Sequence, residues 1–193
     1  MHRLLVVACS TRPTRVGFPV AEWAATRARD DGRFDVRLVD LREIALPLFD
    51  EPHHPRLKRY AHEHTRRWSR QVEWADALVF VTPEYNHGYP AALKNAIDYL
   101  HEEWRFKPAG FVSYGGIAAG TRAVQALKPV LDCLRMIPVY EGVNIAFVHE
   151  LLADGAFAAG KAHDEAARSM FDTLAFWAER NAALFVRAPE EPH

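Results

Sequence analysis

Three short segments combine hydroxyl, guanidinium, aromatic and glycine groups that could bind a flat, phosphorylated ligand. They read STRPTRVG at residues 10–17, PEYNHGYP at 83–90 and SYGGIAAG at 113–120. Each follows an apolar run and precedes a stretch with helical spacing, so each is predicted to connect a strand to a helix. In sheets of α/β proteins, such connections are the usual place of ligand sites.

The first segment suits an anion. It carries hydroxyl groups at Ser10, Thr11 and Thr14, and guanidinium groups at Arg12 and Arg15. Together with free N–H groups at the start of the following helix, these donors could hold a phosphate. The segment matches neither the G-x-x-x-x-G-K-[ST] loop nor the G-x-G-x-x-G fingerprint. It therefore predicts a mononucleotide phosphate site, against the alternative of a solvated turn.

The second and third segments suit the ring system of such a ligand. Tyr85 and Tyr89 offer planar faces, and peptide groups in a proline-flanked turn can meet the edge of a heteroaromatic ring. The glycines of the third segment let the backbone approach a ligand closely, but Gly115, Gly116 and Gly120 lack the spacing of a dinucleotide fingerprint.

The elements that position these segments alternate between strand and helix. Apolar runs predict strands at 3–8, 34–41, 77–83, 109–114 and 139–147. Helical spacing predicts helices at 18–30, 57–74, 90–100, 121–136 and 164–186. Because parallel neighbours need crossover connections, the chain is predicted to be a doubly wound α/β protein with helices on both faces of the sheet.

Composition narrows the class of protein. The 193 residues are 49% hydrophobic and 25% charged, which predicts one globular domain over residues 1–193. Lys plus Arg number 24 and Asp plus Glu 25, so the net charge of −1 disfavours a nucleic-acid partner. No apolar run reaches the roughly 20 residues of a membrane span, and the N-terminal run is too short for a signal peptide. We therefore expect a cytoplasmic protein without a membrane partner.

The three segments resemble those of the NADPH-dependent FMN reductases, a flavodoxin-like family that includes quinone, azo-dye and chromate reductases. The resemblance covers about residues 3–147, and its strongest part is PEYNHGYPAALKNAIDYL at 83–100. It implies a flavodoxin-like, doubly wound, five-stranded parallel sheet in the order 2-1-3-4-5.

The resemblance also implies a cofactor site. It places the FMN phosphate in the first segment and the isoalloxazine ring between the other two. The implied cofactor-binding residues are Ser10, Arg12, Arg15, Val16, Gly17, Pro83, Glu84, Tyr85, Asn86, Ser113, Tyr114, Gly115 and Gly116. The implied reaction passes hydride from NADPH or NADH through FMN to a quinone or a similar small acceptor, in ping-pong order. No side chain is predicted to act as a catalytic acid or base, because the cofactor carries the chemistry.

Two other functions stay open at this point. The chain could be a flavin-binding redox sensor or electron-transfer protein that acts through a protein partner. It could also be a relative that has lost flavin and serves as an interaction domain.

Metal chemistry is not expected. His62 and His64 are two apart on a predicted helix and should face different ways, which argues against a zinc site. The two cysteines, Cys9 and Cys133, lack zinc-ligand spacing.

The resemblance further implies a homodimer, or a homotetramer of two dimers. In such dimers the helix that follows the second segment packs across the two-fold axis. Trp104 lies beyond the apolar stripe of that helix, so we expect it to anchor the subunit contact.

Overall fold

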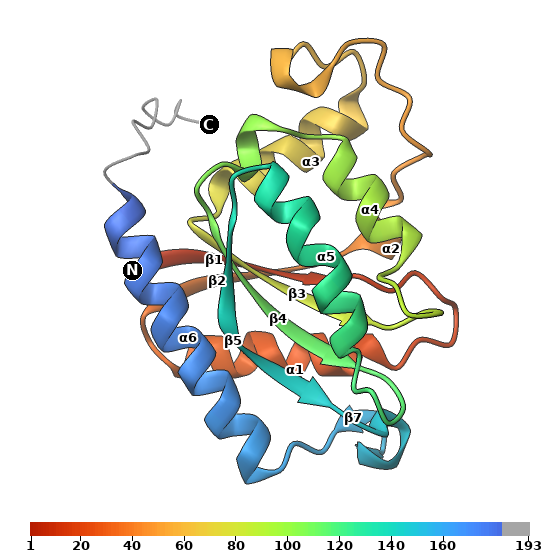
Figure 1. Ribbon diagram of the computed structural model, residues 1–193, viewed down its shortest axis with the longest axis vertical. Helices are drawn as coiled ribbons and strands as arrows, with labels where there is room; N and C mark the ends of the chain where they lie inside the picture. The colour runs from red at the N-terminus through yellow and green to blue at the C-terminus, as the bar shows by residue number, and fades with distance from the viewer. Residues whose placement is uncertain (183–193) are drawn as a thin grey trace.

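A five-stranded parallel sheet forms the centre of the computed structural model, which describes residues 1–182 (Figure 1). Its strand order is β2-β1-β3-β4-β5, as the sequence predicted. The strands are β1 (His2–Ala8), β2 (Phe34–Asp40), β3 (Ala77–Pro83), β4 (Pro108–Tyr114) and β5 (Ile137–Ile145). The doubly wound fold is therefore confirmed.

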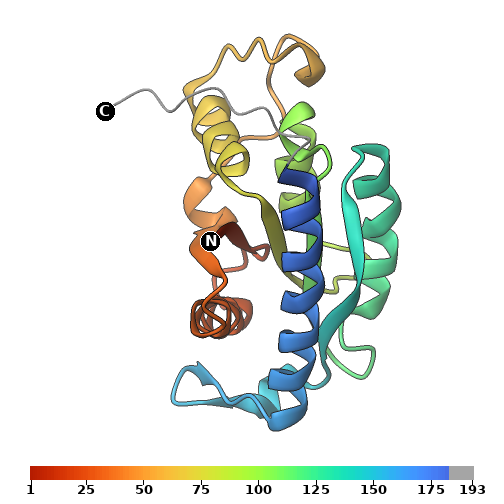
Figure 2. The same ribbon diagram turned by 90° about the vertical axis from the view of Figure 1, so that its left-hand side faces the viewer.

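Helices cover both faces of the sheet. The long helices are α1 (Gly17–Asp30), α3 (Glu63–Trp74), α4 (Ala91–Asp98), α5 (Thr121–Cys133) and α6 (Lys161–Asn181). The short elements are α2 (Leu41–Ile44), the 3₁₀ turns η1 (Pro55–Leu57), η2 (Glu102–Trp104) and η3 (Val148–Leu151), and a hairpin of β6 (Leu152–Ala153) and β7 (Ala156–Phe157). Figure 2 shows α6 beside β5.

Two apolar cores lie on the two faces of the sheet. In β1, Leu4 and Val6 pack toward α1 and α6, whereas Leu5 and Val7 pack toward α3, α4 and α5. Both sets are fully buried, which explains why the strand is one continuous apolar run. This covering on both faces leaves the carboxyl ends of the strands as the place for a ligand.

Several predicted boundaries were wrong. The helix expected from residue 57 begins at Glu63, because Lys58, the residue after η1, lies in the left-handed region (φ 50°) and interrupts the helical conformation. The expected strand to residue 147 ends at Ile145, and the last helix begins at Lys161 rather than at residue 164. Residues 183–186 of that predicted helix lie outside the described residues.

Two predictions about single side chains were also wrong. Trp104 is fully buried, donates from Nε1 to the Ile97 carbonyl oxygen at 3.1 Å and packs on Trp68, so it cannot anchor a subunit contact. His62 and His64 do not face different ways, because His62 precedes the helix; their rings stack at 5.1 Å. Within residues 1–182, no group of three His, Cys, Asp or Glu side chains could hold a metal ion.

Lys107 makes the stability of the fold depend on pH. It is buried, its Nζ donates to the Val72 carbonyl oxygen, and burial lowers its pKa to about 7. The pKa of a lysine in an unfolded chain is about 10.4. Between pH 7 and this value, the unfolded chain therefore binds more protons than the folded one. We therefore expect the free energy of unfolding to rise from pH 7 to 10 and Lys107→Met to remove this rise.

Urea unfolding at each pH would measure this effect. Lys161→Met is the matched control, because the Lys161 side chain is exposed. A pH slope that is the same in wild type and in Lys107→Met would contradict the prediction.

One further observation concerns membranes: among the helices of residues 1–182, none has the length and apolar character to cross a bilayer.

Candidate functional site

A cavity of about 740 Å³ lies where β1, β3 and β4 end. These strands are neighbours in the sheet, so the three segments that follow them share one edge. In Figure 1 the arrows of β4 and β5 point toward β7, which lies at the same edge. Ten of the predicted cofactor-binding residues line the cavity: Ser10, Arg12, Arg15, Val16, Pro83, Glu84, Tyr85, Tyr114, Gly115 and Gly116.

The other three predicted residues are not in the lining. A Cβ atom on Gly17 would fall 1.9 Å from Tyr114 Oη, so the missing side chain makes room for that ring. The Ser113 hydroxyl lies 2.8 Å from the Ala119 carbonyl oxygen and 2.9 Å from Asn144 Oδ1, which ties the third segment to β5. Asn86 forms the turn of the second segment.

The two arginines of the first segment have different surroundings. Arg15 is largely buried and forms an ion pair with Asp40 at the end of β2, while its Nε and Nη1 atoms have no hydrogen-bond partner among the described residues. Arg12 is exposed at the cavity, and no partner of its guanidinium group is found within residues 1–182. Both arginines therefore have N–H donors left for a ligand.

The start of α1 adds to this donor set. Its N-cap residue is Val16, which has no side chain able to accept a hydrogen bond from the first turn, and the first turn has no acidic residue. The N–H groups at this end are thus available to an anion.

The second segment is a tight two-residue turn. Tyr85 N donates to Gly88 O at 2.9 Å and Gly88 N donates back to Tyr85 O at 3.0 Å. Asn86 and His87 have φ values of 50° and 68°, as the two central residues of a type I′ turn require. The Tyr85 hydroxyl lies 2.6 Å from Ser10 Oγ, so the first and second segments are joined.

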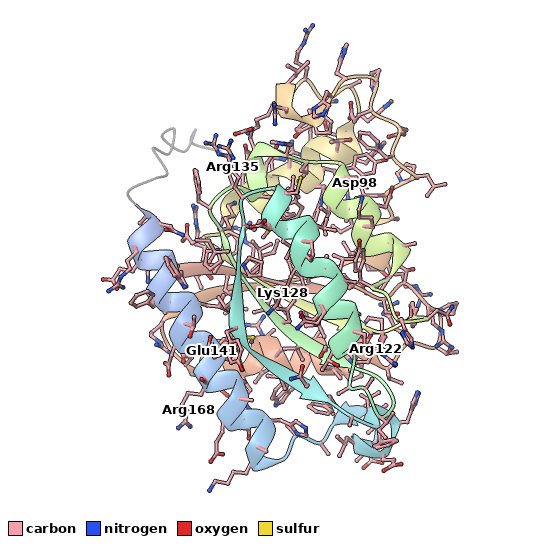
Figure 3. The ribbon with its side chains drawn as sticks, in the orientation of Figure 1. Asp98, Arg122, Lys128, Arg135, Glu141 and Arg168 are labelled. Carbon is pink, nitrogen blue, oxygen red and sulfur yellow. The ribbon has the colours of Figure 1, made fainter. Side chains whose placement is uncertain are left out.

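Arg122 fastens the second segment to α5. Its guanidinium group pairs with Glu84 and lies 2.8 Å from His87 Nε2 through Nη1. Figure 3 shows Arg122 at the end of α5 that adjoins the third segment. Because the Glu84 side chain is largely buried, this pair fixes the wall of the cavity.

Backbone hydrogen bonds join the third segment to the residues that follow β5. Phe147 N donates to Gly116 O at 3.3 Å and Val148 N donates to Gly115 O at 3.2 Å. These bonds bring residues into the lining that the sequence analysis missed: Phe147, Val148, His149 and Glu150, together with Thr14 of the first segment. Residue 147 was expected to end a strand, and no local pattern shows that this chain returns to the third segment.

The residues present fit a phosphorylated flavin. The unpartnered N–H groups of Arg15 and the free start of α1 suit a phosphate at one end of the cavity. The Tyr114 hydroxyl lies beside Gly17 at the same end; burial raises the pKa of Tyr114, so this hydroxyl stays protonated, and it has no hydrogen-bond partner within the described chain. A volume of about 740 Å³ lies within the usual range for cofactor sites.

Sheet order and the position of the cavity define a flavodoxin-like protein. Residues 2–150 match the model of the NADPH-dependent FMN reductase family, and the chain belongs to that family. It is therefore an oxidoreductase with FMN as its cofactor and NAD(P)H as its source of electrons.

Individual relatives agree with this assignment. The chain is 43% identical over 136 residues to an NAD(P)H-dependent FMN reductase of Schizosaccharomyces pombe, covering 69% of this chain and 68% of the relative. It is 30% identical over 154 residues to a quinone reductase of Pseudomonas putida, covering 72% and 76%. The flavoenzyme FerB of Paracoccus denitrificans has the same fold, with a TM-score of 0.74 and 24% identity over 93% of this chain and 98% of that one.

Proposed function

We propose that this enzyme transfers hydride from NADPH or NADH through FMN to quinones or similar small acceptors, in ping-pong order. The observation that carries the proposal is the cavity at the ends of β1, β3 and β4, which brings the arginines of the first segment together with Tyr85 and Phe147. One cavity of this volume would receive the two substrates in turn. The similarity to a quinone reductase supports the class of acceptor.

In this proposal the chain binds and orients the cofactor. Arg12, Arg15 and the start of α1 hold the phosphate, while the peptide groups of the second and third segments meet the ring. The glycines at 115 and 116 let the backbone come close to it. When bound, FMN supplies the chemistry: it takes hydride from the nicotinamide and passes two electrons to the acceptor.

Anaerobic spectroscopy and steady-state kinetics test this function. NADPH should bleach the flavin absorbance of the purified protein, and a quinone should restore it. Initial rates with both substrates varied should give parallel double-reciprocal lines, whereas intersecting lines would exclude the ping-pong order. Slow bleaching, with return of colour only through a protein partner, would favour the redox sensor instead.

Arg12→Ala is expected to weaken FMN binding by about 1.5–3 kcal/mol, the cost of a lost hydrogen bond to a charged group. Riboflavin has the same ring without the phosphate, so its binding should change little. Quenching of flavin fluorescence would measure both affinities. Arg168→Ala is the control, because Arg168 lies on the distant helix α6 (Figure 3). An equal loss of affinity for FMN and riboflavin would show that Arg12 does not bind the phosphate.

Homodimer or homotetramer assembly, a cytoplasmic location and a single domain over residues 1–193 stay predictions.

A further inference from the structure

Phe147 is a half-exposed aromatic ring in the lining of the cavity. Three aromatic residues line this space, and the other two are already engaged: Tyr114 is buried, and the Tyr85 hydroxyl bonds to Ser10. The Phe147 side chain, in contrast, is 49% exposed and has no polar atom that water could satisfy. Its ring thus leaves apolar area uncovered within a ligand site.

The backbone holds this ring in place at an energetic cost. Phe147 has φ 48° and ψ 45°, the left-handed region that costs a residue with a Cβ about 1–2 kcal/mol. Its N–H donates to Gly116 O at 3.3 Å, and its carbonyl oxygen accepts from Glu150 N at 2.9 Å. Strained residues that the surroundings hold so firmly are concentrated at ligand sites.

The chemistry of the ring limits what it can recognise. Phe147 offers only an apolar face and edge, while the charged side chains of the lining are Arg12, Arg15, Glu84 and Glu150. A flat aromatic molecule gains most from such a face, because offset or edge-to-face ring contacts add to the burial of apolar area. A compact inorganic oxidant gains nothing from it.

We propose that Phe147 is a specificity-determining residue that contacts a flat aromatic electron acceptor, such as a quinone with two fused rings. The inference rests on the proposed function, since it requires a quinone to enter the cavity. It adds to that function a residue from outside the three segments and a preference for extended rings over compact acceptors.

Variants at this position test the inference with two acceptors, a naphthoquinone and ferricyanide. Phe147→Gly keeps the left-handed backbone and removes only the ring, so it should fold at least as well as wild type. We expect the KM for the naphthoquinone to rise about 3- to 10-fold, and the ratio of kcat/KM for naphthoquinone to that for ferricyanide to fall to the same extent. Phe147→Tyr, which keeps the ring, should restore most of this ratio.

Matched controls distinguish a failure of the inference about Phe147 from a failure of the proposed function. Tyr140→Ala removes a ring that is 92% exposed on β5 outside the cavity lining, and the ratio should not change. An unchanged ratio in Phe147→Gly, with both acceptors still reduced, would overturn the role of Phe147 but not the proposed function. Failure of wild type to reduce either acceptor would overturn the function itself.

Two further measurements on Phe147→Gly identify other partners of the ring. A loss of FMN affinity in fluorescence titrations, without a change in the ratio, would show that the ring contacts the cofactor rather than the acceptor. A change in oligomeric state by gel filtration, again with no change in the ratio, would show that it contacts a second copy of the chain. Either result overturns the inference.

Discussion

Replacing Gly120 by alanine is expected to destabilise the fold by about 3 kcal/mol or more. Gly120 precedes α5 with φ 77°, and an added Cβ would lie 2.8 Å from Tyr114 N and 2.9 Å from Ser113 Cβ. The left-handed conformation costs about 1–2 kcal/mol and the overpacking about 1–3 kcal/mol. The backbone of β4 cannot move away, because it pairs with both β3 and β5.

Alanine substitutions at two other glycines distinguish the conformational cost from the cost of overpacking. Gly32 has φ 79° but no atom near an added Cβ, so Gly32→Ala should show the conformational cost alone. Gly116 has neither problem, and Gly116→Ala should be neutral or slightly stabilising. Urea unfolding would measure all three variants. If Gly120→Ala costs no more than Gly32→Ala, the argument from crowding is wrong.

Replacing Gly17 by alanine should disable the site. The added Cβ would lie 1.9 Å from Tyr114 Oη and 2.5 Å from Tyr114 Cζ, so the tyrosine ring has to leave its place. Because that ring is buried and lines the cavity, we expect a loss of stability of about 1–3 kcal/mol together with a large loss of FMN affinity.

A double-mutant cycle with Tyr114→Ala tests this coupling. Once the ring is removed, Gly17→Ala should cost little further stability or FMN affinity, which gives a coupling of about 1–3 kcal/mol between the two positions. Denaturant unfolding and flavin fluorescence would measure the two quantities. Additive effects would mean that the alanine acts through the start of α1 and not through Tyr114.

The sequence predicted the parts of the molecule that depend on local patterns. The bounds of β3 agree with the run from Ala77 to Pro83, because a strand covered on both faces is one nearly continuous apolar run. The three segments were placed at one sheet edge because the alternation of elements predicts parallel strands, whose carboxyl ends share an edge, while the resemblance implied the strand order.

The features that were missed depend on contacts between distant residues. Phe147 reaches the site because its N–H donates to the Gly116 carbonyl oxygen. Arg15 of the first segment forms an ion pair with Asp40, at the end of β2. Trp104 has charged neighbours and looked like a surface residue. However, the carboxylate of Glu103 accepts hydrogen bonds from Tyr60 and Ser69, which allows this charged turn to pack inside.

The ion pair between Arg15 and Asp40 has a consequence for how quickly an anionic cofactor is captured. Opposite charges in contact cancel each other's field at a distance, so Arg15 contributes little to attraction across solvent. The exposed guanidinium group of Arg12 keeps its long-range field. Arg12 therefore governs the rate of encounter, whereas Arg15 acts after arrival and lengthens the residence time.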